Sequence, residues 1–252
     1  MMDSVQCYSF NLGQLKCLFT SKAAGSFTFS RARRQDVLDN YQRLQQATGI
    51  PADRIARAYL DNGIRVVRVG EEDAGKGVTR EPGHLFKVDA LYTNAPGLHI
   101  GITTADCFPL IFHDPVHKAV GLAHCGWRGI VWRLEHKLLS AMSEDFGTAP
   151  KDVVAVIGPG IRDCCYHQHD DGLKTAFADY SSLDLVRELP DGIYTIDIAL
   201  ALRANLAALG INKIVDTKLC TGCNPDFFSA RKEGIATGRS LTLASLRPGT
   251  ES

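Results

Sequence analysis

The spacing of hydrophobic positions predicts helices in three parts of the chain. Residues 33–49 carry apolar side chains every three or four positions and end at a glycine, which favours a helix that stops there. The same spacing from Ile130 to Met142 predicts one long helix that ends near Gly147. A third helix is expected at 197–209, with an aspartate in the N-cap position and a glycine after it.

Short apolar and β-branched runs predict strands between these helices. Three largely apolar runs, at 98–103, 108–112 and 119–123, are typical of neighbouring strands that are largely buried on both faces. Further strands are expected at 64–69, 88–92, 153–157 and 213–219. The charged, glycine-rich segment 70–83 is expected to form a loop. Because strands and helices alternate without a repeat or linker, we predict one α/β or α+β domain over residues 1–252.

Composition and charge narrow the classes of function. The chain has 252 residues, of which 45% are hydrophobic and 22% charged, as in an ordinary globular protein. Its 28 basic and 28 acidic residues cancel, so we expect neither nucleic acid nor an anionic membrane as a partner. No apolar run approaches the roughly 20 residues of a membrane span. The polar N-terminus is unlike a secretion signal, and we expect a cytoplasmic protein.

Two segments with cysteine and histidine follow the ends of predicted strands. Residues 104–109 contain Asp106 and Cys107, and residues 123–129 contain His124. Thiolate and imidazole are good zinc ligands, and a catalytic zinc typically uses three protein ligands and leaves one position for water. Residue types alone leave two interpretations open. The pair forms a zinc or Cys/His catalytic site, or it is a buried thiol beside a core histidine.

Two other motifs are weaker signals. Residues 70–76 match the frame of a phosphate-binding loop, but Gly77 stands where Ser or Thr would bind magnesium, and three carboxylates would repel phosphate. We therefore interpret this segment as a surface loop. His167 and His169 form a single H-x-H pair, whereas a multi-copper centre needs several such pairs, so we expect a solvated loop there.

The remaining cysteines include a C-x-x-C motif formed by Cys220 and Cys223. A structural zinc site needs about four ligands, and Cys164 with Cys165 would be the second pair. Adjacent cysteines do not easily reach one tetrahedral centre together, so we expect four buried or mildly reactive thiols instead. The sequence does not indicate whether Cys125, the neighbour of the candidate histidine His124, modifies the site.

Several segments, taken together and in order, resemble the family of multicopper polyphenol oxidoreductases, or laccase-domain proteins, whose bacterial members are also called purine nucleoside phosphorylases. These segments are 89–93, 104–109, 123–129, 157–161, 227–231 and 237–239. The resemblance implies an α+β (layered α/β) single domain with mixed sheets packed between helices. It also implies bound zinc and phosphorolysis of purine nucleosides, with adenosine deamination and phenol oxidation attributed to the family as well.

The resemblance implies that Cys107 and His124 bind the metal, but the chain departs from the family at one position. The family usually carries Gln-Val-His-Gly before its next strand, and here Asn62 stands in place of that histidine. An amide oxygen is a poor zinc ligand compared with imidazole. Three outcomes stay open: a weakened site, a site completed by His84 or by Asp61, and a site without metal. Zinc is expected in preference to copper.

Phosphorolysis requires phosphate behind the anomeric carbon and help for the departing purine. Arginine is the natural phosphate clamp, and Arg128, Arg231 and Arg239 lie inside the matching segments. We expect one or more of them to bind phosphate, although each suits a structural ion pair equally well. For deamination, Asp106 is the candidate that moves protons beside a zinc-activated water, and its alternative role is to cap a turn.

Three alternative functions stay open. The first is a diverged, metal-free member that binds nucleoside-like or cell-wall-precursor ligands. The second is a cysteine amidase acting on peptidoglycan precursors, in which His124 activates Cys107 as the nucleophile. The third, polyphenol oxidation, ranks last because no multi-copper ligand set is visible in the sequence. The sequence does not fix the oligomeric state.

Overall fold

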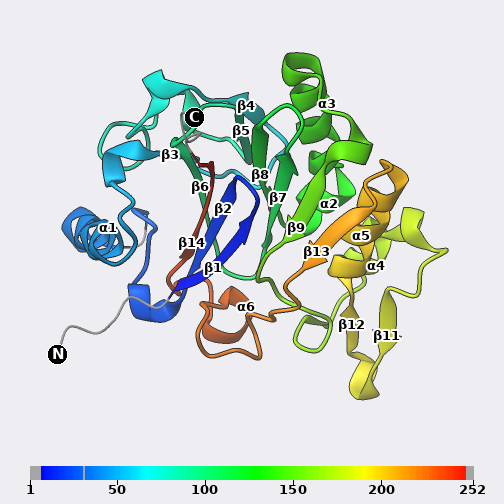
Figure 1. Cartoon of the computed structure of the whole chain (residues 1–252). Helices are drawn as coiled ribbons and strands as arrows, with labels where there is room; N and C mark the ends of the chain where they lie inside the picture. The colour runs from blue at the N-terminus through cyan, green and yellow to red at the C-terminus, as the bar shows by residue number, and fades with distance from the viewer. Residues whose placement is uncertain (1–6, 31, 248–252) are drawn as a thin grey trace.

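Two mixed β-sheets lie face to face at the centre of the molecule (Figure 1). The computed structural model of the chain describes residues 7–30 and 32–247. In the five-stranded sheet the order is β1-β2-β14-β6-β3, and in the six-stranded sheet it is β13-β9-β7-β8-β5-β4. The strands of the first sheet are β1 (Cys7–Leu12), β2 (Leu15–Thr20), β3 (Ile55–Arg57), β6 (His99–Thr104) and β14 (Ser240–Leu246). Those of the second are β4 (Val66–Arg68), β5 (Ala90–Thr93), β7 (Phe108–Asp114), β8 (Ala119–Cys125), β9 (Val154–Ile157) and β13 (Lys213–Asp216).

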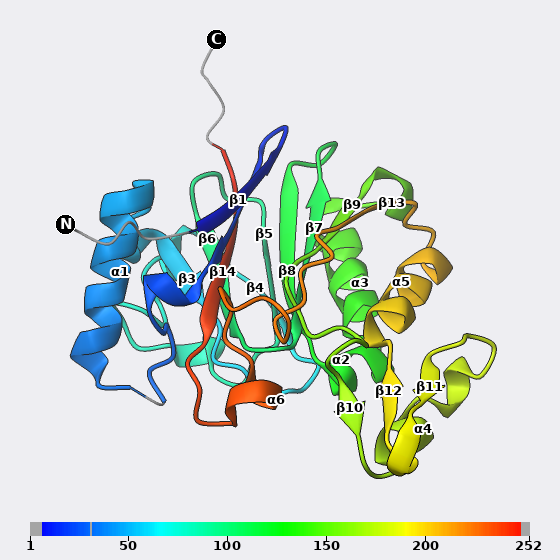
Figure 2. The same ribbon diagram turned by 90° about the horizontal axis from the view of Figure 1, so that it is seen from below.

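Helices cover the outer faces of both sheets (Figure 2). Helix α1 (Arg34–Thr48) packs on the five-stranded sheet, and α3 (Leu134–Phe146) and α5 (Ile198–Ala208) pack on the six-stranded sheet. The shorter helices are α2 (Trp127–Val131), α4 (Gly172–Ala176) and α6 (Ala230–Glu233). A small third sheet consists of β10 (His167–Gln168), β12 (Tyr194–Ile196) and β11 (Val186–Glu188). No helix within the described ranges is long and apolar enough to cross a membrane.

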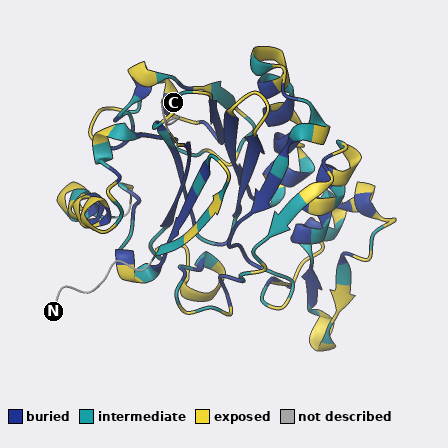
Figure 3. Ribbon diagram, in the orientation of Figure 1, coloured by how far each residue is buried: buried dark blue, intermediate teal, exposed yellow. Residues whose placement is uncertain are grey.

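The layer between the two large sheets is a continuous apolar core. Ile100 and Ile102 of β6 belong to the same buried cluster as Ile111 of β7 and Leu122 of β8. Every residue of β7 and β8 is buried, because the sheet has this core on one face and helices on the other (Figure 3). At Gly121 a Cβ atom would lie 2.8 Å from the sulfur of Met142, so only glycine lets α3 approach β8 this closely.

The observed layers confirm the predicted α+β class with mixed sheets between helices. The helices predicted at 33–49 and 197–209 are confirmed as α1 and α5. The side chain of Asp197 accepts a hydrogen bond from the backbone N–H of Leu200 at 2.9 Å, which caps α5 as its residue type suggested.

Two predictions of secondary structure differ from the fold. The predicted long helix is broken into α2 and α3, because Arg133 adopts a left-handed backbone with φ of +59°. Its apolar spacing continues across the break, so periodicity alone does not reveal the break. In addition, β6 is not a sheet neighbour of β7 and β8, since it pairs with β3 and β14 in the other sheet. A continuous apolar run indicates burial on both faces but does not identify the partner strand.

Glu135, in the first turn of α3, is a buried carboxyl group between helices. Its exposed fraction is 0%, and neither carboxyl oxygen has a hydrogen-bond partner within the described part of the chain. Burial raises the pKa of Glu135 to about 7, and the interactions with its own backbone N–H, with the side chain of Asn205 and with the guanidinium of Arg133 offset only part of this effect. The folded protein therefore holds this proton more tightly than the unfolded chain does.

We expect Glu135→Gln to stabilise the protein above pH 7. Between the ordinary glutamate pKa of 4.5 and the folded value of about 7, the folded state binds the extra proton, so the free energy of unfolding falls as pH rises through this window. The amide does not ionise, so it avoids the cost of a buried negative charge. The free energy of unfolding of the variant should exceed that of the wild type by about 1–3 kcal/mol near pH 8, and this difference should shrink toward pH 4. Urea unfolding across this range measures it, with the exposed Glu81→Gln as control. A wild-type minus variant difference that does not change with pH would contradict this prediction.

Candidate active site

A cleft with a volume of about 480 Å³ opens where strands from both sheets end. Its floor comes from the carboxyl ends of β3, β6 and β8, which contribute Arg57, Thr104 and His124. Cys107, in the turn between β6 and β7, also lines it. The two chemical segments found in the sequence therefore meet at one edge, although β6 and β8 belong to different sheets. A volume of this size is in the range of small-molecule sites.

His124 and Cys107 lie against each other in this cleft. The imidazole of His124 is buried, and its Nδ1 lies 3.0 Å from Oδ1 of Asp89. Burial acts to lower the pKa of His124, but the electrostatic interaction with Cys107 and the hydrogen bonds to Asp89 and Cys107 outweigh it and raise the pKa to about 10. At neutral pH these interactions favour the protonated imidazole, which lies between the sulfur of Cys107 and the carboxylate of Asp89.

Asp89 connects His124 to the loop that follows β3. Its Oδ2 accepts hydrogen bonds from the backbone N–H groups of Gly63 at 2.8 Å and Asp61 at 3.3 Å. Burial acts to raise the pKa of Asp89, while these bonds and the contact with His124 outweigh it and lower the pKa. Asn62, between the two donors, lines the cleft with a left-handed φ of +56°. Asp89 lies in one of the segments that resemble the family, but it was not among the predicted site residues.

Two other predicted site residues lie outside the residues that line the cleft. Nε2 of His84 lies 3.4 Å from Oδ1 of the buried Asp73, which engages this histidine within its own loop. Asp106 has a left-handed φ of +90°. Its carboxylate oxygens accept hydrogen bonds from the Thr221 hydroxyl and the Arg231 backbone N–H, each at 2.7 Å. The geometry therefore gives Asp106 the turn-holding role considered as its alternative.

The three predicted phosphate-binding arginines have different positions. Arg239 lines the cleft, and its guanidinium donates hydrogen bonds to the carbonyl of Thr237 at 2.6 Å. Arg128 is exposed, stacks on the ring of Trp127 at 4.4 Å and borders a small hollow beside the cleft. Arg231 is also exposed, and its guanidinium stacks on Tyr166 at 4.9 Å.

Arg57 is a cleft residue that the sequence did not single out. It is only 2% exposed, and it donates hydrogen bonds to the carbonyls of Gly77 at 2.9 Å and Phe27 at 3.4 Å. Its Nη2 is buried without a hydrogen-bond partner among the residues that the structure describes. A buried guanidinium nitrogen without a partner is costly, and it is the expected state of a group that binds an anionic ligand. The sequence feature that could have identified Arg57 is a cationic residue at the end of a buried strand.

Comparison with known proteins identifies the family. The family model described as multi-copper polyphenol oxidoreductase laccase matches residues 24–247. The chain belongs to this laccase-domain family. It is 34% identical over 224 residues to purine nucleoside phosphorylase YlmD of Geobacillus stearothermophilus, covering 85% of this chain and 80% of that protein. It is 31% identical over 211 residues to adenosine deaminase RL5 of an unknown prokaryotic organism, covering 82% and 80%. The crystal structure of YlmD from Geobacillus stearothermophilus matches with a TM-score of 0.88 at 28% identity, over 98% of this chain and 100% of that one.

The cleft of this laccase-domain protein does not offer a complete set of zinc ligands. Cys107 and His124 are two good donors, and Asp89 on Nδ1 is the support that a metal-binding histidine usually has. The third position carries Asn62, whose amide is a poor zinc ligand. Within the described ranges no third histidine, cysteine or carboxylate joins the pair, and the one group of such side chains close enough to hold a metal lies elsewhere. The residues of the cleft therefore do not complete a zinc site, and the described ranges hold no multi-copper ligand set.

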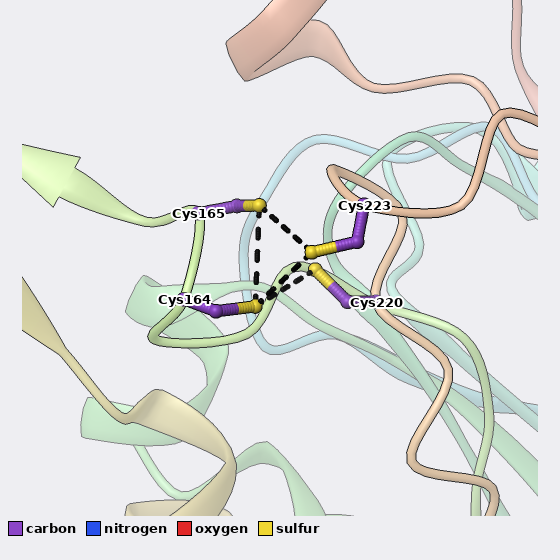
Figure 4. A group of neighbouring side chains, drawn as sticks. All are labelled: Cys164, Cys165, Cys220 and Cys223. Carbon is purple, nitrogen blue, oxygen red and sulfur yellow. Dashed lines mark hydrogen bonds between the residues drawn. The ribbon is translucent and has the colours of Figure 1, made fainter.

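That single cluster consists of the four cysteines Cys164, Cys165, Cys220 and Cys223 (Figure 4). Their sulfur atoms all lie within 4.8 Å of one another. Adjacent cysteines were not expected to reach one centre easily, but the tight turn at 162–166 directs both side chains toward the C-x-x-C motif. Of the four thiols expected to be buried or mildly reactive, Cys220 is buried, Cys165 is half-buried, and Cys164 and Cys223 are exposed.

We expect Asp89→Asn to destabilise the protein and loosen the cleft. The amide loses the charge that stabilises the His124 imidazolium, and it cannot accept on both oxygens from the imidazole and the loop N–H groups. The free energy of unfolding should fall by about 1–3 kcal/mol. Urea unfolding measures this, with Asp61→Asn, an exposed position of the same loop, expected within about 0.5 kcal/mol of the wild type. Equal stability of the two variants would show that Asp89 does not hold the site together.

Proposed function

We propose that this chain is a purine nucleoside phosphorylase, which binds a nucleoside and inorganic phosphate in the cleft and cleaves the N-glycosidic bond. The observation that carries the proposal is the buried Arg57, whose Nη2 faces no partner within the described residues, in the same cleft as Cys107 and His124. The name of the relative YlmD supports the same reaction. The cleft volume of about 480 Å³ suits a ligand of nucleoside size.

In this proposal Arg57 and Arg239 bind the phosphate. Both guanidinium groups line the cleft and both are fixed by hydrogen bonds to backbone carbonyls, so neither needs to be ordered when the anion arrives. Arg57 also lies with its guanidinium carbon 4.2 Å from the ring centre of Tyr59, which holds its plane in one orientation. A fixed, planar donor group is suited to two parallel hydrogen bonds with phosphate oxygens.

Two aromatic side chains give the cleft a surface for the purine base. Tyr59 and Phe86 line it with ring centres 6.3 Å apart, and Phe86 is 52% exposed although it is a large apolar residue. An exposed aromatic face at the wall of a polar cleft is suited to stacking on a planar ligand. The two rings therefore place the base at the outer part of the cleft, while the arginines place the phosphate deeper.

His124 is the proton donor in this proposal. The purine leaves more readily when a nitrogen of its ring is protonated, and His124 holds a proton at neutral pH because its pKa is about 10. Asp89 keeps the imidazole oriented, and Cys107 lies against it on the cleft side. Phosphate attacks the anomeric carbon as the carbon–nitrogen bond breaks, and the products are the free base and ribose 1-phosphate.

We expect inosine to release hypoxanthine only when phosphate is present, and Arg57→Gln to raise the KM for phosphate by about 10- to 100-fold. This range corresponds to the loss of one charged hydrogen-bonding partner. Chromatography of the base, together with an assay for ribose 1-phosphate, measures both quantities. Arg187→Gln is the matched control, because this arginine is exposed on β11 of the third sheet, outside the cleft, and should change the KM less than about threefold. Free ribose instead of ribose 1-phosphate, or base release without phosphate, would refute phosphorolysis.

Adenosine deamination is the activity named for the relative RL5. In this chain the carboxylate of Asp106, the candidate for moving protons, is engaged by Thr221 and Arg231 outside the cleft lining. The geometry therefore favours phosphorolysis over deamination. Ammonia release from adenosine, followed in the same assay mixture, separates the two reactions.

A cysteine hydrolase is the second candidate function, because Cys107, His124 and Asp89 have the order of a thiol, imidazole and carboxylate triad. This candidate forms an acyl group on Cys107, whereas the phosphorylase forms no covalent intermediate. Under the phosphorylase proposal we expect intact-protein mass spectrometry to show no adduct when the wild-type protein, which retains His124, is incubated with peptidoglycan-precursor amides and quenched in acid. An added acyl mass on Cys107, absent in Cys107→Ser, would establish the hydrolase instead.

A further inference from the structure

We propose that Cys164, Cys165, Cys220 and Cys223 bind one zinc ion in a structural site separate from the cleft (Figure 4). The first two cysteines lie in the turn that follows β9, and the other two lie in the segment between β13 and α6. The site joins two segments that are more than fifty residues apart along the chain. None of its four residues lines the cleft.

The distances between the sulfur atoms fit a tetrahedral zinc centre. A Zn–S bond of about 2.3 Å places the sulfurs of a regular tetrahedron about 3.8 Å apart. The Sγ atom of Cys164 lies 3.9 Å from that of Cys165, 3.6 Å from that of Cys220 and 3.4 Å from that of Cys223. Cys165 and Cys223 are 3.2 Å apart. A disulfide requires about 2.05 Å, and all four cysteines are free.

The backbone around Cys220 is arranged to stabilise a thiolate. The backbone N–H of Arg162 donates to its Sγ at 3.4 Å, and the N–H groups of Gly222 and Cys223 point at the same sulfur. Hydrogen bonds to a charged acceptor are stronger than those to a neutral one, so three N–H groups around one sulfur suit a metal-bound thiolate. This arrangement is independent of the distances between the four sulfurs.

Gly222 shows how closely the site is built. A Cβ atom at this position would lie 2.6 Å from Cβ and 2.9 Å from Sγ of Cys165, so no larger residue fits between the two cysteine pairs. Its carbonyl accepts a hydrogen bond from Nζ of Lys232 at 3.1 Å. Four thiolates around one Zn²⁺ carry a net charge of −2, and this ammonium group reduces the cost of that charge.

An all-sulfur tetrahedral site selects zinc or iron among the common metals. We assign zinc because four filled ligand positions without an open one are typical of structural zinc sites. Iron is the outcome that metal analysis would distinguish. The exposed positions of Cys164 and Cys223 give the ion an entry path.

The zinc site would also hold one side of the cleft in place. Thr221, inside the C-x-x-C motif, donates its hydroxyl hydrogen bond to Asp106 at 2.7 Å, and Asp106 directly precedes Cys107. The neighbouring Cys220 forms a bridge with Gly160, which fixes the motif against the turn after β9. Through these contacts the ion would maintain the strained backbone of Asp106, whose φ is +90°.

The test is a titration of the metal-free, reduced full-length protein with Co²⁺, followed by displacement with Zn²⁺. We expect about one equivalent of Co²⁺ to produce the intense visible bands of tetrahedral tetrathiolate cobalt, and Zn²⁺ to abolish them. Mass spectrometry of purified protein should find about one zinc per chain. Cys223→Ser should lose the bands and most of the zinc, and Gly222→Ala should lower Co²⁺ affinity at least tenfold without removing a ligand.

Two matched variants separate this site from the cleft. Cys107→Ser and Cys7→Ser each remove a thiol outside the cluster, and both should keep the tetrathiolate spectrum and the zinc content. Zinc should also raise the midpoint of thermal unfolding of the wild type and of Cys107→Ser, but not that of Cys223→Ser. Absence of the bands in wild-type protein, their persistence in Cys223→Ser, iron in place of zinc, or loss of zinc in Cys107→Ser would each overturn the proposal.

Discussion

Burial of both faces of the central strands decides where polar side chains can lie in this molecule. Every residue of β7 and β8 is buried, since one face of their sheet meets the other sheet and the other face meets helices. Side chains inside such a stack cannot carry chemistry that needs water or a ligand. Polar groups that are to meet a ligand must therefore stand where strands end. This is why Arg57, Thr104 and His124 gather at one edge and form the cleft there.

The polar groups at this edge depend on one another for their stability. His124 is buried and protonated because Asp89 and Cys107 lie against it, and Asp89 in turn fixes the loop that carries Asn62. Removing water from any one of these groups is unfavourable by itself, and the hydrogen bonds and charge interactions within the network offset this cost. Arg57 is the exception, with one buried nitrogen that has no partner in the described ranges. An anion that reached this nitrogen would satisfy it.

Five of the eight thiols of this laccase-domain protein fall into two different environments. Cys107 stands in the cleft beside an imidazole, where only one further good donor is close, whereas four other sulfurs surround one point outside it. These environments suit different roles, a reactive or proton-linked group in the first and a cross-link in the second. They are also connected, because Thr221 of the cysteine cluster holds Asp106 next to Cys107. A perturbation of the cluster would therefore be felt in the cleft through a single short turn.

Features that depend on local pattern could be predicted from the amino-acid sequence alone. The helices α1 and α5, the buried strands β7 and β8, and the pairing of Cys107 with His124 as candidates all followed from spacing, turn residues and ordered motifs. The tertiary structure decided everything that depends on distance across the chain. It broke the predicted long helix at Arg133, moved β6 to the other sheet, left Arg239 as the only predicted arginine among the cleft residues and added Arg57. It also brought four cysteines together, because two turns far apart in sequence meet only when the sheets pack, and no periodicity along one chain encodes that meeting.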